Sequence, residues 1–413
     1  MGAPAARAAE LAAYWVKEGH EVTILTGFPN HPTGVIPPEY RSKFWRLATR
    51  ERAGDVNVVR SWLLPFPNRK AHERMLNYSS FCLSASTTGM FLSRPDVVIA
   101  TSPQLLVGLS GWWLARIKDA PFIFEVRDLW PESLAAVGMG SPNSALHRGL
   151  GRVAGFLYRK CQQVVVVTPA FKDHLMQHWR LPQEKISVVE NGVETQLFCP
   201  GSGDANLRKQ LGAEGKFVVC YIGTLGMAHG LETLVEAASR LRESAPQVLF
   251  VLVGEGSEKQ RILAMATSRG LNNLRFVAQQ PREKIPDYVR TADACLVLLR
   301  RTELFKTVIP TKMLEFMSCG RPVIVGVDGQ ARQIVEEAKA GLYIPPENAA
   351  ALAEAVVRLA TDAALRESLG ANGRRKVLRD FARERTARDY LSVLGGVARG
   401  AHAQSRAAAS GPR

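Results

Sequence analysis

The 413-residue sequence is poor in cysteine and has no arrangement of cysteines that suggests a cross-link or a metal site. None of its six cysteines forms a C-x-x-C pair, and most of them lie in apolar runs. This usage is typical of reduced core residues in a cytoplasmic protein. The chain also lacks an apolar run of about 20 residues and an N-terminal signal-peptide pattern. We therefore expect a cytoplasmic protein with no membrane-spanning helix.

Two further motifs are absent. Without G-x-G-x-x-G, a dinucleotide-dependent dehydrogenase is disfavoured. Without D-x-D, a departing diphosphate is expected to be stabilised by protein cations and helix dipoles, with no metal and no cofactor required. His174 and His178 have the i, i+4 spacing of metal ligands, but HLMQH lacks the metalloprotease glutamate. We interpret them as exposed helix residues.

The composition is that of a folded protein with an excess of positive charge. Hydrophobic residues make up 46% and charged residues 22%, and the net charge is +15. Such a charge attracts polyanions. Because no helix-turn-helix, zinc-finger or RNA-binding signature accompanies the scattered basic residues, nucleic acid is disfavoured. An anionic membrane surface and a nucleotide diphosphate are the expected partners.

Alternating short apolar strands and helices predict an α/β protein with two Rossmann-like, doubly wound parallel-sheet domains facing a cleft. Strands are expected near 20–27, 56–61, 96–101, 121–126 and 163–168, then at 217–223, 248–254, 274–278, 294–299 and 322–326. We assign 1–190 to an N-terminal domain, 191–380 to a C-terminal domain, 381–399 to a helix returning to the first domain, and 400–413 to a disordered tail. Since a helix precedes the first strand, we expect that the usual leading strand is missing.

A glycine-containing turn follows the apolar strand FVVCYIG and precedes the helix LETLVEAASRL. Gly223, Thr224 and Gly226 allow the backbone to approach an anion, and a helix N-terminus offers unpaired N–H groups to a diphosphate. A tight connection between strand and helix explains the same glycines equally well.

The segment from Lys306 to Ile324 is more informative. Thr311 is predicted to cap a helix that begins near Lys312, so that this lysine is aimed at the ligand crevice. Lys312 can pair with phosphate while Glu315, one turn later, accepts hydrogen bonds from ribose hydroxyls. The alternative is an exposed lysine and glutamate on a surface helix.

Five ordered blocks, GHEVTILTGFPNHP, FEVRDLWPES, KISVVENGVETQLF, YIGTLGMAHGLETLVEA and PTKMLEFMSCGRPVI, make the chain resemble the GT-B family 4 glycosyltransferases, in particular the WbuB-like subgroup of bacterial polysaccharide assembly. The resemblance spans nearly the whole chain. It implies a retaining transferase whose C-terminal domain holds the nucleotide sugar and whose N-terminal domain holds the acceptor.

The resemblance also implies roles for individual residues. Glu315 matches the second carboxylate of the family's E-x7-E motif, but the first position is Thr307. His229 stands where many members have a diphosphate-binding lysine, and Thr224 where they have an arginine. Lys306 and Lys312 can supply compensating charge. The predicted donor-binding residues are Gly223, Thr224, Gly226, Val277, Lys306, Thr307, Pro310, Thr311, Lys312 and Glu315, with catalytic roles for Lys312, His229, Asp128 and Arg127.

Arg127 and Asp128 follow a core strand at the end where α/β sheets bind ligands. Asp128 can orient a sugar hydroxyl, although a structural Arg–Asp pair is the plain alternative. Asn30 and His31 follow an earlier strand and are candidate acceptor contacts, as are Gly2 and Arg7 near the start of the chain.

These inferences predict transfer of a sugar, by front-face attack, from a nucleotide diphosphate, most simply UDP, to a polyprenyl-diphosphate-linked sugar or an oligosaccharide. The segments 41–52 and 72–92 are expected to lie on the inner face of the cell membrane, unless the second is an interdomain or core helix. Two rivals stay open, namely a GT-B sugar-nucleotide epimerase and a non-catalytic nucleotide-binding partner of an assembly complex. The sugar, the linkage and the oligomeric state are not predicted.

Overall fold

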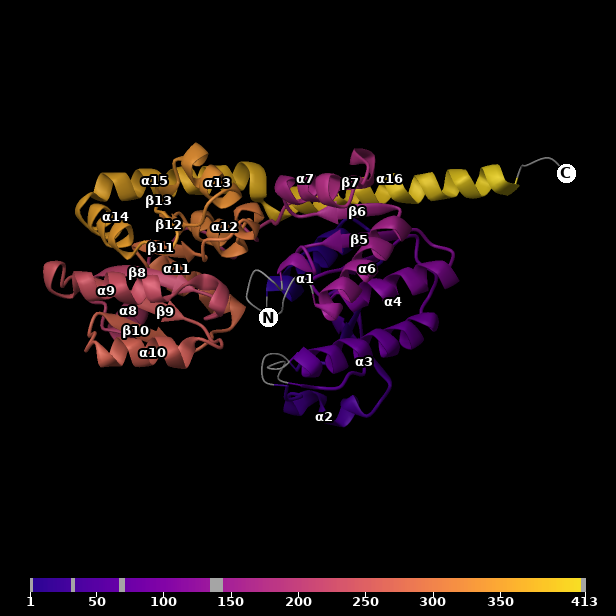
Figure 1. Cartoon of the computed structure of the whole chain (residues 1–413), viewed down its shortest axis with the longest axis horizontal. Helices are drawn as coiled ribbons and strands as arrows, with labels where there is room; N and C mark the ends of the chain where they lie inside the picture. The colour runs from indigo at the N-terminus through magenta and orange to yellow at the C-terminus, as the bar shows by residue number, and fades with distance from the viewer. Residues whose placement is uncertain (1–2, 31–33, 67–70, 134–143, 410–413) are drawn as a thin grey trace. The chain divides into compact units, whose positions relative to one another are not determined.

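The computed structural model describes residues 3–30, 34–66, 71–133 and 144–409. The chain divides into two compact units, each treated by itself below (Figure 1). The C-terminal unit comprises Asn191–Thr386 with Met1–Arg7, and the N-terminal unit comprises Ala8–Glu190 with Ala387–Arg413. None of the helices in the described part of the chain combines the length and the apolar character needed to cross a bilayer.

The C-terminal unit contains a six-stranded, all-parallel sheet with the order β10-β9-β8-β11-β12-β13. Residues of β8, β9, β11 and β12 are buried throughout, as expected for parallel strands covered on both faces. The five strands predicted in this half are confirmed, and the short β13 was missed because its three residues carry no apolar run. The strands are β8 (Phe217–Ile222), β9 (Val248–Val253), β10 (Leu274–Val277), β11 (Ala294–Leu298), β12 (Val323–Gly326) and β13 (Gly341–Tyr343).

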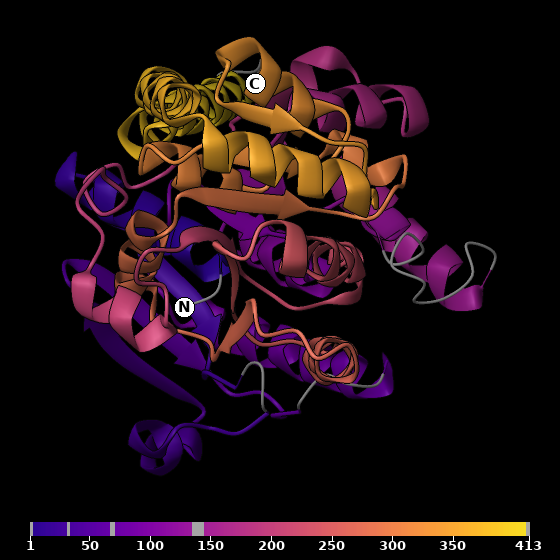
Figure 2. The ribbon, with the colours of Figure 1, turned by 90° about the vertical axis from the view of Figure 1, so that its left-hand side faces the viewer.

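Helices cover both faces of this sheet (Figure 2). Alternate residues of β8 belong to opposite hydrophobic clusters: Val218 and Cys220 face one helical layer, and Val219 and Tyr221 face the other. The helices of this unit are α8 (Ala205–Leu211), α9 (Glu232–Ser244), α10 (Lys259–Ser268), α11 (Ile285–Thr291), α12 (Thr311–Ser318), α13 (Gln330–Ala338), α14 (Ala349–Thr361) and α15 (Ala363–Lys376), with the short turns η2 (Met227–His229), η3 (Arg282–Lys284), η4 (Leu304–Thr307) and η5 (Val377–Phe381).

The strand order of the C-terminal unit reverses next to β8. From β8 the chain adds β9 and β10 on one side, and then returns to add β11, β12 and β13 on the other side. Such a reversal leaves a crevice at the carboxyl ends of the two central strands, here β8 and β11. The segments that follow these two strands therefore lie where a ligand of this sheet is expected.

The N-terminal unit has its strands in two sheets, with the orders β1-β3-β2 and β4-β5-β6-β7. The strands are β1 (Thr23–Gly27), β2 (Ala48–Ala53), β3 (Val56–Ser61), β4 (Val98–Thr101), β5 (Phe122–Val126), β6 (Gln163–Val166) and β7 (Ile186–Val188). The helices are α1 (Ala3–Lys17), which belongs to this unit from Ala8 onward, α2 (Pro38–Phe44), α3 (Ala71–Met90), α4 (Leu105–Ile117), α6 (Ala145–Lys160) and α7 (Pro169–His178), with the turn η1 (Gln183–Lys185).

One segment of this unit contains a strand that was not predicted. The second half of the stretch 41–52, which was expected to lie on a membrane, forms β2, and this strand pairs antiparallel with β3. Arg60 of β3 donates to Glu51 of β2 at 2.6 Å. The two strands are joined by the turn at residues 54–55, and their pairing makes this stretch a strand.

The long C-terminal helix α16 (Arg383–Ala409) lies beside α1 (Figure 1). Trp15 Nε1 donates to the Ala387 carbonyl at 3.1 Å, and the Trp15 and Tyr390 rings meet edge to face at 5.3 Å. The helix continues to Ala409, so the predicted disordered tail 400–413 is wrong for residues 400–409. Alanine, arginine and glutamine, which favour helices, dominate that stretch.

Candidate functional site

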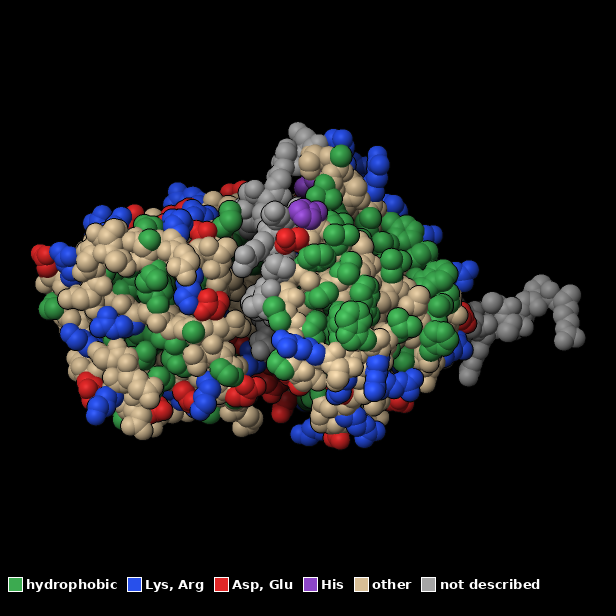
Figure 3. Space-filling model, turned by 90° about the horizontal axis from the view of Figure 1, so that it is seen from below, with side chains coloured by type: hydrophobic (Ala, Val, Ile, Leu, Met, Phe, Trp, Pro, Cys, Tyr) green, Lys and Arg blue, Asp and Glu red, His purple; other side chains and the backbone are tan. Residues whose placement is uncertain are grey.

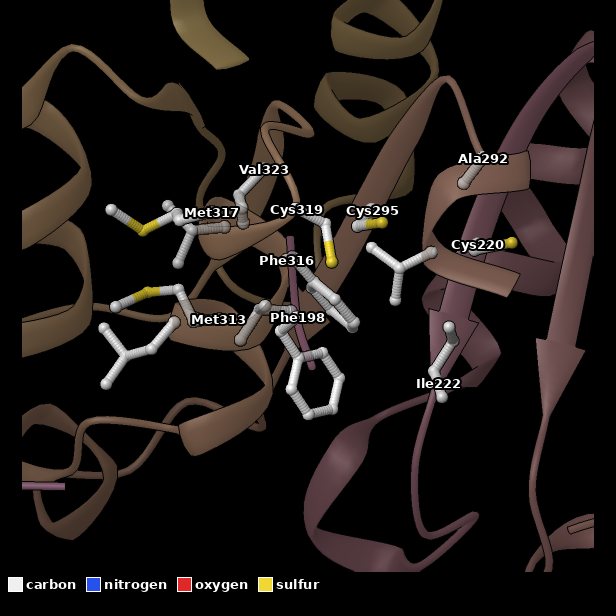
Figure 4. Close-up of a cluster of buried hydrophobic side chains, with 14 of the residues drawn as sticks. Phe198, Cys220, Ile222, Ala292, Cys295, Met313, Phe316, Met317, Cys319 and Val323 are labelled. Carbon is white, nitrogen blue, oxygen red and sulfur yellow. The ribbon is translucent and has the colours of Figure 1, made fainter. Parts of the chain in front are cut away.

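Helix α12 places the most informative residues of the sequence at the crevice of the C-terminal unit. Its apolar side chains Met313, Phe316 and Met317 are fully buried against the sheet (Figure 4). This anchoring leaves Lys312 at the N-terminal end of the helix, next to the carboxyl end of β8. The predicted cap is wrong in one respect. Pro310 is the N-cap residue and Thr311 the first helical residue, and no side chain caps this end.

Lys312 contacts the segment that follows β8. Its Nζ donates to the Tyr221 hydroxyl at 3.0 Å and lies 4.1 Å from the centroid of the Tyr221 ring. The Tyr221 hydroxyl in turn donates to the Thr224 carbonyl at 2.8 Å. Burial lowers the pKa of Lys312 to about 7, against a smaller opposing effect of Glu315. The lysine and the glycine turn, which are 91 residues apart in sequence, therefore form one site.

Two glycine turns lie side by side at this edge of the sheet. Gly223 has φ of 143°, and a Cβ placed on it would lie 3.1 Å from Lys312 Nζ. A Cβ on Gly254, which follows β9, would overlap the Gly223 carbonyl oxygen, and one on Gly256 would overlap the Leu225 backbone. Gly254 and Gly256 were not among the site residues predicted from the sequence. Their G-x-G spacing directly after a strand was the signal that could have identified them.

His229, in η2, is held as a neutral imidazole. Its Nδ1 lies 3.2 Å from the Leu298 carbonyl oxygen at the end of β11. Burial, and then the charge of Lys312, lower the pKa of His229 to about 3. Because a carbonyl oxygen only accepts, Nδ1 carries the proton and Nε2 is left as an acceptor. His229 therefore does not reproduce the charge of the lysine that many family members have at this position.

Glu315 lies one turn after Lys312, is buried, and pairs with an arginine that the sequence analysis missed. Arg282, in the segment after β10, donates to Glu315 Oε1 at 2.9 Å and lies over the Phe198 ring at 5.1 Å. The two residues are 33 positions apart, and no local pattern connects them. The plain alternative of an exposed lysine and glutamate on a surface helix is therefore wrong for Glu315.

The other predicted donor-binding residues lie at the same edge of the sheet, and they differ in exposure and in hydrogen-bond partners. Lys306 pairs with Glu303 at 2.6 Å, and the Thr307 hydroxyl donates to the Leu304 carbonyl at 2.6 Å. Thr224 is exposed and offers no positive charge. Val277 ends β10, where its carbonyl accepts from Gly254 N at 3.0 Å. Gly226 precedes η2.

The predicted residues of the N-terminal unit follow β1 and β5. Burial raises the pKa of Asp128 to about 6, partly offset by the charge of Arg127. The backbone N–H of Arg127 donates to Ser102 Oγ at 2.8 Å, which fixes the turn after β5. Asn30 Nδ2 is buried without a hydrogen-bond partner in the described part of the chain.

The three remaining residues predicted to contact the acceptor are Arg7, Gly2 and His31. Arg7 is buried, and its guanidinium donates to Asn191 Oδ1 at 3.3 Å within the C-terminal unit. Its surroundings are therefore those of a structural residue. Gly2 and His31 lie outside the described residues.

His174 and His178 face a carboxylate. Their Nε2 atoms lie 3.5 Å and 3.9 Å from Glu132 Oε1, and the two rings stack at 5.2 Å. The interpretation of His174 as an exposed residue is thus wrong, because this side chain is largely buried against Glu132. Across residues 3–30, 34–66, 71–133 and 144–409, no group of three His, Cys, Asp or Glu side chains is placed to hold a metal ion.

Two family models match the chain, one in each half. Residues 2–192 match the model "Glycosyl transferase 4-like domain", and residues 204–376 match "Glycosyl transferases group 1". The chain belongs to the family 4 glycosyltransferases of GT-B fold. This confirms the resemblance stated from the sequence, and the two parallel-sheet α/β domains confirm the predicted fold class.

Known proteins similar to this family 4 glycosyltransferase span most of its length. WcaI of Escherichia coli strain K12, whose name assigns it a glycosyl transfer in colanic acid biosynthesis, is 26% identical over 76% of this chain and 77% of its own. Sucrose-phosphate synthase from Thermosynechococcus elongatus has a TM-score of 0.76 at 22% identity, covering 96% and 94%. Anabaena HepE, in a complex with UDP and glucose, has a TM-score of 0.68 at 20% identity, covering 91% and 100%.

Proposed function

We propose that this family 4 glycosyltransferase moves a hexosyl or N-acetylhexosaminyl group from a UDP-linked donor to a lipid-linked or oligosaccharide acceptor during surface polysaccharide assembly. The observation that carries the proposal is the contact of Lys312 with the Gly223 turn at the strand-order reversal. The name of WcaI and the UDP complex of HepE support the class of pathway and the nucleotide.

The diphosphate is assigned to the space between Lys312 and the glycine turn. Backbone N–H groups of a glycine turn and one lysine ammonium suit two phosphates. In the free protein the pKa of Lys312, about 7, is close to neutral pH, and an incoming diphosphate favours the protonated form of this lysine. Glu315 is assigned to the ribose hydroxyls, with Arg282 holding the carboxylate in place.

The transfer step is proposed to proceed with retention of anomeric configuration. The bond from the anomeric carbon to the diphosphate oxygen breaks, and the acceptor oxygen bonds to the same carbon from the same face. The acceptor proton passes to the departing phosphate oxygen, so that neither a protein nucleophile nor a metal ion is required. Lys312 stabilises the charge that grows on the leaving group.

The acceptor hydroxyl is assigned to residues of the N-terminal unit. Asp128 is ionised above about pH 6 and can accept a hydrogen bond from a sugar hydroxyl. The buried Asn30 Nδ2 can donate one. Arg127 is proposed to keep Asp128 ionised, in agreement with the direction of its effect on the Asp128 pKa.

The test compares the purified full chain with Lys312→Met and with Lys209→Met, which removes an exposed cation from α8. UDP-sugars should raise the melting temperature of the parent and of Lys209→Met but not of Lys312→Met. Transfer to a polyprenyl-diphosphate-linked sugar should fall by roughly a hundredfold or more in Lys312→Met alone. Equal ligand shifts in all three proteins would refute the donor assignment.

The same preparations separate the two rivals. An epimerase would consume the UDP-sugar without acceptor and release a stereoisomer, whereas a non-catalytic partner would bind it and leave it unchanged. The transferase consumes it only with acceptor. NMR of the product then determines the anomeric configuration of the transferred sugar. A product with inverted configuration would contradict the retaining step.

A further inference from the structure

We infer that α3 and α4 of the N-terminal unit present a docking face for an anionic lipid bilayer. We call it the α3–α4 face. It consists of six exposed hydrophobic residues, Leu76, Leu83, Met90, Phe91, Trp113 and Ile117. The inference deepens the proposed function, because it specifies the surface by which the enzyme reaches a lipid-linked acceptor.

The two helices form one continuous surface. The Ser110 hydroxyl of α4 donates to the Cys82 carbonyl of α3 at 2.9 Å. At Gly89 of α3, an added Cβ would collide with the Leu114 side chain of α4. Lys118 Nζ, just beyond α4, donates to the Met90 carbonyl at 3.1 Å. Contacts along both helices therefore hold them side by side.

The outward positions of α3 are apolar at regular spacing. Leu76, Leu83 and Met90 follow one another at seven-residue intervals, which places them on one stripe of the helix. Leu83 is 71% exposed, and Phe91, directly after the helix, is 81% exposed. The opposite stripe, with Phe81 and Ala85, is buried against Leu63. The exposed stripe therefore does not contribute to the packing of α3 against the rest of the unit.

Helix α4 adds its own apolar side chains to this surface. Gly111 is packed against Ala100 and Phe122 of the sheet, which fixes the inner face of the helix. Trp112 packs against Phe156 of α6 at 4.8 Å, whereas the neighbouring Trp113 is 42% exposed. Figure 3 shows hydrophobic side chains gathered over this unit, bordered by lysine and arginine side chains. Trp and Phe at an apolar surface suit the headgroup boundary of a bilayer.

The charge around the face favours anionic lipid over a second copy of the chain. Arg94, Arg116 and Lys118 lie at the carboxyl ends of the two helices, and the carboxylates beside them in sequence are Asp96 and Asp119, of which Asp119 pairs with Arg94. Helix α6, which packs on α4, has basic residues and no acidic ones. A symmetric pair of such faces would bring like charges together, whereas anionic headgroups neutralise them.

The experiment uses the full chain and vesicle flotation, with phosphatidylcholine alone or with roughly one third phosphatidylglycerol. The test variant combines Leu83→Ser, Phe91→Ser and Trp113→Ser. The matched control combines Leu263→Ser, Val357→Ser and Leu378→Ser, three exposed residues of the C-terminal unit. We expect the parent and the control to float with the anionic vesicles and the test variant to bind on the order of tenfold more weakly.

UDP binding separates this inference from the proposed function. All three proteins should show the same UDP thermal shift, because the test substitutions lie on another unit than α12 and the control substitutions replace exposed side chains that make none of the contacts described for the Lys312 site. Absence of flotation by the parent, or equal flotation of the test variant and the parent, would overturn the docking face and leave the donor site standing. The docking face would also be overturned if the parent formed a dimer in solution and the test variant were a monomer.

Discussion

The Lys312 ammonium lies 3.0 Å from the Tyr221 hydroxyl and 4.1 Å from the centroid of the same ring. One aromatic side chain thus offers the lysine both a hydrogen-bond acceptor and a π face. Since the Tyr221 hydroxyl also donates to the Thr224 carbonyl, the position of the lysine is linked to the shape of the glycine turn.

Tyr221→Phe should loosen the turn without leaving a cavity. The substitution removes the hydroxyl between Lys312 and the Thr224 carbonyl but keeps the ring. We expect a loss of about 1 kcal/mol in the free energy of unfolding and a several-fold rise in the Kd for UDP. Chemical denaturation and calorimetric titration measure both quantities. An unchanged Kd would mean that the hydroxyl does not position the lysine for the diphosphate.

The pH dependence of kcat/KM should be bell-shaped and narrow. Activity requires ionised Asp128, whose pKa is about 6, and protonated Lys312, whose pKa is about 7. The rate should therefore rise with pH through 6 and fall as Lys312 loses its proton above 7. A UDP-sugar bears no phosphate group that titrates in this range. Asp128→Asn should remove the acidic limb, and its persistence would contradict the assignment.

His229→Leu should separate sugar binding from nucleotide binding. Since Nδ1 donates to the Leu298 carbonyl, Nε2 is the atom left to accept from a sugar hydroxyl. We expect the Kd of the UDP-sugar to rise about tenfold and that of UDP to change by less than about twofold. His229→Gln, which retains an acceptor, is the matched control. An equal loss for both ligands would show that the imidazole acts on the diphosphate instead.

Arg282→Ala should weaken both the fold and the ribose contact. It deprives the buried Glu315 carboxylate of a donor at 2.9 Å. We expect a destabilisation of about 1–3 kcal/mol, together with weaker UDP binding. Arg282→Lys, which keeps the charge, should recover part of both losses. Comparing uridine with deoxyuridine nucleotides in each variant tests the ribose role, because the affinity difference should shrink in Arg282→Ala only.

Tyr390→Ala should destabilise the N-terminal unit by about 3–5 kcal/mol, since a fully buried aromatic ring is removed from beside Trp15. Tyr390→Phe keeps the edge-to-face contact and should cost far less. Thermal unfolding monitored by tryptophan fluorescence reports the change. Similar melting temperatures for the Ala variant and the parent would show that α16 does not support this unit.

The proposed donor site was predicted from the sequence through two local signals, the glycine turn after one strand and the P-T-K-M-L-E segment. Both are short-range patterns, because a strand, a turn and a helix N-terminus are encoded by neighbouring residues. Arg282 carries no such signal. Its relation to Glu315 exists only because β10 ends and α12 begins at the same edge of the sheet.

The chain's periodicity alone was enough to predict strands buried on both faces, helices between them and two α/β domains, since burial on a regular backbone imposes a regular spacing of apolar residues. It could not show that Glu315 pairs with Arg282, that His229 is neutral, or that Lys312 titrates near 7. Those properties arise from pairing and desolvation by residues distant in the chain, and only the tertiary structure brings such residues together.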